Sequence, residues 1–318
     1  MSYLHIENLY KEQGILMFKE CYAMEKIHGT SAWLSYSPGD HVEKHLDGGA
    51  ILHSVSPTRL TFFAGGGNYN DFVKLFDEQA IKDKLDGMGF NLKDVPARKH
   101  VHIYGEYYGG KIMGMGKTYG DKGKFVAFEV KIGDKWLNVE KAEAFVKSLG
   151  LEFVHYKRIP TTMEAIEAET HEPSVQAIRN GMGQSADKFG FIPPIREGIV
   201  LRPIEEVTTN NGERVIAKHK RPEFSETRTT RIVSPEKLKI IEEAKAIANE
   251  WVTRERLYHI LDGIEMKVEN TGKVIALMTE DILREAKGEI VDSPNARKQI
   301  AKETALLFKE MIKGELLK

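Results

Sequence analysis

The hydrophobic pattern of this chain changes once along its length, near residue 232. Before this point, short runs rich in Val, Ile, Tyr and Phe alternate with polar residues, as in "SAWLSYS", "RLTFFA" and "KFVAFEVKI". Alternation with a period of two is typical of half-buried strands. After this point, apolar residues recur at helical spacing. The sequence therefore predicts two domains, a sheet-rich α+β domain over residues 1–231 and an all-α domain over residues 232–318.

Helix signals lie in both domains. In the first, residues 69–87 and 138–150 are each expected to form one helix that closes at a glycine. In the second, Ser234 is expected to cap a helix with Pro235 at its first position. Two later helices are expected from apolar residues at helical spacing: Ile275, Met278 and Ile282 in one, and Ile300, Leu307, Phe308 and Met311 in the other.

The composition restricts the class of protein. The 318 residues are 41% hydrophobic and carry a net charge of −1, which is typical of a globular chain and gives no bulk basic signature of a nucleic-acid binder. A single cysteine, Cys21, excludes an internal disulfide framework and fits a reducing compartment. The sequence shows no targeting peptide and no apolar run of about 18 residues, so a cytoplasmic location is expected.

The stretch "EKIHGTSAWL" places Lys26 just before a predicted strand, three residues ahead of Gly29. Lys-x-x-Gly alone is not specific, because a solvated lysine at a strand end fits it equally well. A lysine can also act as a nucleophile when its amine is neutral, which happens when it is desolvated or crowded by other cations. That function requires partners elsewhere in the chain.

Four later segments supply candidate partners. They are "HIYGEYYGG" with Glu106, "KFVAFEVKI" with Phe128, "REGIVLRP" with Glu197, and "VIAKHKRPEFSE" with Lys218 and Lys220. Each also has a structural interpretation, as an edge-strand charge, a core aromatic, a turn acid or the solvent face of a strand. Phe128 is the hardest to separate from a core residue, because its segment alternates like any half-buried strand.

Taken in order, these segments resemble the nucleotidyltransferase motifs of ATP-dependent polynucleotide ligases and mRNA capping enzymes. The sequences "KIHGT" and "KHKRPEFSE" are most similar to the phage-type RNA ligase 2 family. The resemblance covers residues 22–226 in scattered blocks. It implies an N-terminal nucleotidyltransferase domain of antiparallel sheets and flanking helices, followed by a small helical domain.

The chain departs from the family pattern at three places. Ser31 stands where the family usually has asparagine, and Glu129 is the acid that follows the stacking aromatic. The segment "SPGDHVEKHLDGG" resembles an insertion and displaces the second motif, which leaves Arg59 as the candidate basic residue of that motif.

The chemistry of adenylyl transfer explains why these residue types occur together. Lys26 would attack the α-phosphate of ATP, expel pyrophosphate and retain AMP as a covalent adduct. Lys218 and Lys220 share one face of a strand at their spacing of two. Both would disfavour protonation of Lys26 and neutralise charge on the phosphate oxygens. Glu197 supplies a carboxylate for Mg²⁺, which Mn²⁺ could replace.

The resemblance assigns the remaining roles. It implies that Glu106 binds the ribose, Phe128 stacks on adenine, Glu25 and Ile27 read the base, and Arg202 lies near phosphate, with Arg59 as a further binding residue. His28 either takes part in the chemistry or is a structural imidazole bonded to backbone.

The expected activity is the joining of RNA 3′-hydroxyl and 5′-phosphate ends through lysyl-AMP and an adenylylated 5′ end. A nicked RNA duplex is the expected substrate, and the expected state is a monomer. A DNA ligase or a capping guanylyltransferase would carry a β-rich domain after the last motif, against the helical pattern found here. A non-catalytic nucleic-acid-binding module would not need the lysines and glutamates together.

Overall fold

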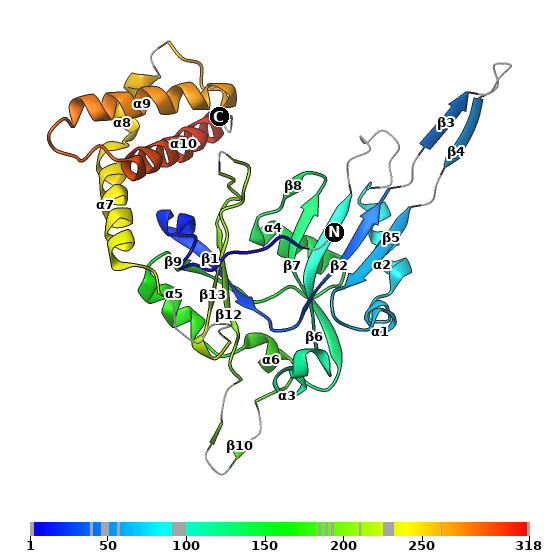
Figure 1. The fold of residues 1–318 in the computed structure, drawn as a ribbon. Helices are drawn as coiled ribbons and strands as arrows, with labels where there is room; N and C mark the ends of the chain where they lie inside the picture. Colours follow the sequence, from blue (N-terminus) through cyan, green and yellow to red (C-terminus); the bar gives the residue numbers. More distant parts are fainter. Residues whose placement is uncertain are drawn as a thin grey trace. The chain divides into compact units, whose positions relative to one another are not determined.

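The computed structural model describes residues 3–38, 41–45, 51–55, 58–90, 100–183, 186–187, 190–191, 194–209, 211–224, 232–261 and 263–316. The chain divides into two compact units, Met1–Thr230 and Arg231–Lys318 (Figure 1). Part of the insertion-like segment, the end of the last motif at Ser225 and Glu226, and Arg231 at the predicted boundary lie outside the described residues.

The first unit contains two main antiparallel sheets, which confirms the predicted α+β class. One sheet has the strand order β13-β12-β1-β9, with bounds Ala217–Lys220, Gly198–Pro203, Glu20–Lys26 and Tyr156–Pro160. The other has the order β5-β2-β6-β7-β8, with bounds Arg59–Ala64, Thr30–Ser37, Val101–Gly109, Gly123–Ile132 and Lys135–Trp136. Two small hairpins pair β3 (His41–His45) with β4 (Ile51–Val55), and β10 (Ala186–Asp187) with β11 (Gly190–Phe191).

Short helices connect these strands. The α-helices of the first unit are α1 (Tyr69–Val73), α2 (Glu78–Gly87), α3 (Gly116–Tyr119), α4 (Val139–Ser148), α5 (Met163–Thr170) and α6 (Val175–Arg179). The 3₁₀ helices are η1 (Gly14–Met17), η2 (Ile112–Gly114) and η3 (Pro222–Phe224).

The main core lies between the five-stranded sheet and its helices. Leu34, Ile103 and Val130 come from three neighbouring strands, and each exposes at most 1% of its surface. Phe72 of α1 and Val146 of α4 belong to the same cluster and are fully buried. Because side chains alternate between the faces of a strand, residues such as Ser31 and Glu106 lie on the opposite face of this sheet.

The predicted helix over residues 69–87 is wrong in one respect, because the structure breaks it into α1 and α2. Asp77 interrupts the pattern, and its carboxylate accepts a hydrogen bond from the amide of Ala80 at 3.0 Å. An aspartate in this position begins a new helix rather than continuing the old one. The predicted helix over residues 138–150 is confirmed as α4, with Asn138 as its cap.

The second unit is helical, and its described residues contain α7 (Pro235–Trp251), α8 (Arg254–Ile260), η4 (Val268–Asn270), α9 (Thr271–Glu285) and α10 (Pro294–Leu316). Helix α7 begins at Pro235 after Ser234, as predicted, although the Ser234 hydroxyl contacts Glu236 instead of capping the helix. The predicted apolar positions Met278, Ile282, Ile300 and Phe308 are fully buried in one cluster.

No helix in the described parts of the chain is both long and apolar enough to cross a membrane.

Candidate functional site

Two of the three candidate lysines meet through the register of the four-stranded sheet. Lys26, the last residue of β1, pairs with Gly198 of β12, and Gly198 pairs with Lys220 of β13. Residues directly opposite one another in antiparallel strands project from the same face. Because the middle position is glycine, no side chain separates the two lysines.

The carboxylate of Glu197 occupies the space between them. Its Oε2 lies 2.9 Å from Lys26 Nζ and 3.1 Å from His28 Nδ1, and its Oε1 lies 3.0 Å from Lys220 Nζ. Only 1% of the Glu197 side chain is exposed. Burial alone would raise the pKa of Glu197, but Lys26 and Lys220 outweigh it and hold the pKa below its ordinary value.

Glu197 is fixed by the residue before it. The guanidinium of Arg196 is buried, pairs with Glu169 at 2.9 Å and donates to the carbonyl of Pro173. These bonds attach the start of β12 to the loop between α5 and α6. Sequence reasoning did not identify Arg196, because its partners lie 23 to 27 residues away with no local pattern.

The glycine of the "KIHG" stretch has a geometric role. The amide of Gly29 donates to Glu106 Oε1 at 3.1 Å, and a Cβ at this position would lie 2.5 Å from the carbonyl oxygen of Tyr107. Only glycine permits this close approach of the turn between β1 and β2 to β6. Burial raises the pKa of Glu106 to about 7, with Lys26 opposing the shift and Glu197 adding to it.

A cavity of about 130 Å³ extends from this group between the two sheets. It brings together six of the predicted site residues and adds side chains that were not predicted as site residues. The predicted ones are Glu25, Lys26, Ile27, Glu106, Phe128 and Arg202. The others include Tyr3, Ile6, Val200, Ile216 and Ser31, the residue that departs from the family pattern. The Ser31 hydroxyl has no hydrogen-bond partner among the described residues.

Phe128 enters the cavity through an irregularity in β7. The pairing of β6 with β7 passes from Tyr104 opposite Glu129 to Gly105 opposite Ala127, so Phe128 has no direct partner. Such a β-bulge re-aims side chains. Phe128 and Glu129, which would point to opposite faces of a regular strand, both border the cavity.

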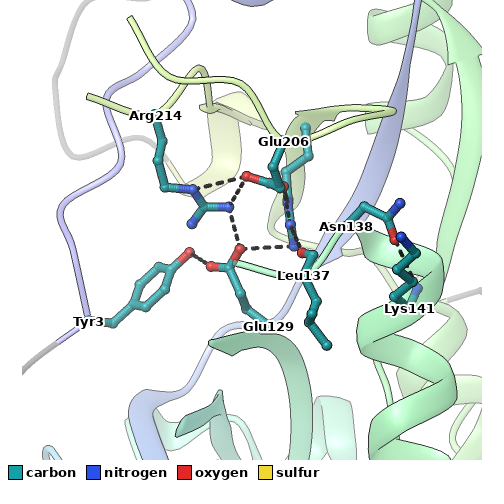
Figure 2. Close-up of polar contacts among 8 residues, drawn as sticks. Tyr3, Glu129, Leu137, Asn138, Lys141, Glu206 and Arg214 are labelled. Carbon is teal, nitrogen blue, oxygen red and sulfur yellow. Dashed lines mark hydrogen bonds and ion pairs between the residues drawn. The ribbon is translucent and has the colours of Figure 1, made fainter. Parts of the chain in front are cut away.

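A buried charged network borders the end of the cavity remote from Lys26, here called the inner end. Figure 2 shows its polar contacts. Glu129 contacts Arg202 Nη1 at 3.0 Å and also accepts from Arg214 and from the hydroxyl of Tyr3. Glu206 bridges the same two arginines from the other side. Burial alone would raise the pKa of Glu129, but the two arginines beside it lower the value.

This network corrects the expected position of Arg202. The residue pairs with Tyr22 in β1, four residues before Lys26, so it lies at the end of the cavity remote from the lysines. Its side chain is 1% exposed and is held by Glu129, Glu206 and the carbonyl of Leu137. Arg202 therefore supports the wall beside Phe128 instead of facing a phosphate near Lys26.

Glu25 lines the cavity, and hydrogen bonds hold its carboxylate in place. Its carboxylate accepts from the Ser174 hydroxyl at 2.5 Å and from the Gln176 amide at 3.1 Å. The side chain is thus held at the start of α6, and burial raises its pKa above the ordinary value. Its neighbour Ile27 is 4% exposed and borders the cavity as well.

Arg59 is not among the residues that line the cavity. It is an exposed residue at the start of β5, opposite Ser37, whereas the cavity meets the other end of β2 at Ser31. The sequence insertion before β5 explains the misassignment, because it separates the motif from its usual spacing.

The third candidate lysine, Lys218, lies opposite Val200 on the face that carries Lys26 and Lys220.

The residues present are compatible with a divalent cation bound together with a nucleotide. Among the described residues, no three or more His, Cys, Asp and Glu side chains are arranged to hold a metal by themselves. Mg²⁺ usually takes only one or two protein carboxylates and completes its shell with water and phosphate oxygens. Glu197 supplies such a carboxylate at the lysine end of the cavity.

The chain matches a protein-family model and several solved structures. A family model described as RNA ligase matches residues 19–220. Structures of a Naegleria gruberi RNA ligase are similar in part. An apo form has 14% identity and a TM-score of 0.45, and a form with ATP and Mn has 15% identity and a TM-score of 0.44. Each match covers 70% of this chain and 57% of the other. No curated protein matches the sequence.

The central glycine of the site should not tolerate a side chain. A Cβ on Gly198 would lie 2.1 Å from the His219 carbonyl oxygen, so Gly198→Ala should push β13 away and cost about 1–3 kcal/mol of unfolding free energy. Urea unfolding measures this change. Gly87→Ala, where nothing lies within 4 Å of the added carbon, serves as the control. Equal stability of the two variants would contradict the prediction.

The partly buried carboxyl of Glu106 should make stability depend on pH. Its pKa of about 7 exceeds the ordinary value of 4.5, so ionisation favours the unfolded state, and its contribution to stability is lost as pH rises from about 4.5 to 7. Glu106→Gln should therefore be more stable than the wild type above pH 7, and this gain should vanish below pH 4.5. Urea unfolding across this range tests it, with the exposed Glu164→Gln as control. Parallel curves for wild type and Glu106→Gln would refute the expectation.

Proposed function

Because the chain belongs to the RNA ligase family, we propose that it is an ATP-dependent RNA ligase that joins a 3′-hydroxyl to a 5′-phosphate through a covalent lysyl-AMP. The observation that carries this proposal is the position of Glu197 between Lys26 and Lys220, at one end of a cavity that Phe128 also lines. Nucleophile, cationic partner, carboxylate and aromatic ring thus surround one space.

In the first step, the Lys26 nitrogen forms a bond to the α-phosphorus of ATP, and the bond to the bridging oxygen breaks to release pyrophosphate. Lys26 pairs with Glu197 in the structure, so its amine must leave this contact and lose a proton before it attacks. Lys220 is near enough to stabilise the charge that develops on the phosphate. Mg²⁺ held by Glu197 would add charge neutralisation when bound.

The rest of the cavity suits the nucleoside part of ATP. Phe128 offers a flat apolar ring, and Ile27 and Val200 add aliphatic surface. Glu106 also lines the cavity and interacts with Lys26, and it can accept or donate a hydrogen bond to ribose, because its pKa is about 7. Ser31 adds a hydroxyl on the same face of the sheet.

In the later steps, AMP passes from Lys26 to the 5′-phosphate of an RNA, and a 3′-hydroxyl then attacks that phosphate and releases AMP. The same cationic side chains can serve each step, since each step is a substitution at a phosphorus atom within the same site. We propose a nicked RNA duplex as the substrate and a monomer as the active form.

Replacement of the nucleophile should abolish the covalent adduct. Neither Lys26→Ala nor Lys26→Arg offers a neutral amine, so incubation with labelled ATP and Mg²⁺ should leave no labelled protein on a denaturing gel. The wild type should be labelled by ATP and should seal nicked RNA.

Pre-adenylylated RNA provides the matched control for this variant. Lys26→Ala should retain some sealing of an RNA that already carries a 5′-adenylyl end, because that step does not use Lys26 as nucleophile. Labelling of Lys26→Ala at the wild-type level would overturn the assignment. Equal labelling of the wild type by GTP would instead favour a capping guanylyltransferase, and sealing restricted to DNA would favour a DNA ligase.

We propose that the first unit carries the nucleotide chemistry and that the helical unit contributes to RNA binding. A fragment that ends near Arg231 should form the adduct with ATP, because the cavity residues all belong to the first unit. It should seal nicked RNA poorly, since small errors in positioning the ends cost rate steeply. The sealing defect should ease at low salt, where phosphate contacts strengthen.

Two measurements separate the alternatives for the fragment. Circular dichroism and size exclusion establish that it is folded, and adduct formation then tests the first unit alone. Sealing by the fragment at the full rate would assign the helical unit to stability or to protein partners. A folded fragment without adduct formation would show that the division of labour is wrong.

A further inference from the structure

The N-terminal segment of the described chain, residues 3–9, connects the two sheets across the cavity. At one end, the amide of Leu9 donates to the carbonyl of Lys218 and the amide of Lys218 donates to the carbonyl of Glu7, both at 2.9 Å. Figure 1 shows this segment in dark blue next to the strands of the four-stranded sheet. These bonds add the segment to the edge of β13, as a short parallel bridge at Asn8.

At the other end, Tyr3 packs on the five-stranded sheet. Its ring centroid lies 5.0 Å from that of Phe128, 5.1 Å from Tyr104 and 6.2 Å from Trp136. Its hydroxyl donates to Glu129 (Figure 2). Burial, together with Glu129, raises the pKa of the Tyr3 hydroxyl well above its ordinary value, so the group remains a neutral donor.

Tyr3 and Ile6 both border the cavity that contains Lys26 and Phe128. A ring that served only to fill the core would not need to border the cavity. Here, the hydrogen bond to Glu129 and the edge contact with Phe128 hold the Tyr3 ring in a fixed orientation at the cavity wall. A flat nucleobase against Phe128 would therefore meet a second aromatic surface that is already positioned.

We propose that Tyr3 is a nucleobase-contacting residue and that residues 3–9 form a wall of the nucleotide site. The proposal rests on the proposed function, because it assumes that ATP occupies this cavity. The segment also links base binding to the phosphate end, since it is bonded on both sides of Lys218. None of the sequence motifs includes residues 3–9.

The test measures adduct formation as a function of nucleotide concentration for Tyr3→Ala, Tyr3→Phe and the wild type. Tyr3→Ala should raise the ATP concentration for half-maximal labelling by about two- to tenfold, the range for the loss of an aromatic contact. The labelling rate at saturating ATP should change less. Tyr3→Phe keeps the ring and should lie closer to the wild type. Tyr69→Ala, which removes a tyrosine that is 53% exposed on α1, should match the wild type.

A second readout distinguishes a contact from a general structural effect. If Tyr3 touches the base, Tyr3→Ala should change the ratio of ATP to GTP labelling, whereas a damaged fold should lower both equally. Should Tyr3→Ala melt below the assay temperature, Tyr3→Leu replaces it as the ring-free variant, with its folding checked by thermal melting.

Three outcomes would overturn the proposal. One is an unchanged ATP dependence and base ratio in a folded ring-free variant. Another is tighter ATP binding in that variant, which would show that Tyr3 obstructs the cavity. The third is an equal loss with Tyr3→Phe and the ring-free variant, which would assign the effect to the Glu129 bond alone. Absence of any labelling in the wild type would instead refute the proposed function itself.

Discussion

The arrangement of the site depends on one buried carboxylate that satisfies two lysines and a histidine at the same time. Glu197 is 1% exposed, and a buried charge is tolerated only when it is paired and hydrogen-bonded. The pairing in turn requires that β1, β12 and β13 approach one another closely. Gly198 allows this approach, and Arg196 fixes the start of β12. The positions of the three strands therefore determine how Glu197 is paired, and the pairing of Glu197 in turn holds the strands together.

The two ends of the cavity differ in their electrostatics. At the Lys26 end, Lys26 and Lys220 contact the two oxygens of Glu197, so two cationic groups lie close enough together to attract an anion. At the inner end, Arg202 and Arg214 are balanced by Glu129 and Glu206, with the Arg214 guanidinium 4.2 Å from the centre of the Trp136 ring. A balanced, buried network is better suited to support an uncharged base than to bind an anion.

The parts of this structure that the sequence predicted are those with local patterns. Alternating strands, the helix at 138–150 and the buried face of α9 follow from period and capping alone. Lys26, Glu197 and Lys220 were named from separate motifs, and the sheet register places these residues together, while their roles stay a proposal. The break at Asp77 was missed because its capping bond competes with a continuous apolar period.

Other features depend on contacts between residues far apart in the chain. Tyr3 and Glu129 are separated by 126 positions, and Arg214 reaches Glu129 across 85. No spacing rule reports such partners, so Tyr3, Arg214 and Glu206 were not foreseen. Arg202 was recognised as a basic site residue but placed at the wrong end, because a motif gives the type of a residue and not the direction of its strand across the cavity.

The bulge at Phe128 also bears on how this site could change during evolution. One extra residue lets a single strand present an aromatic ring and a carboxylate side by side, where a regular strand would offer only every second residue. Loss of that residue would turn Glu129 away from Arg202 and Arg214 and leave both guanidinium groups without their shared anion. An insertion or deletion between Ala127 and Glu129 would therefore disturb the aromatic wall of the cavity and the charged network behind it at the same time.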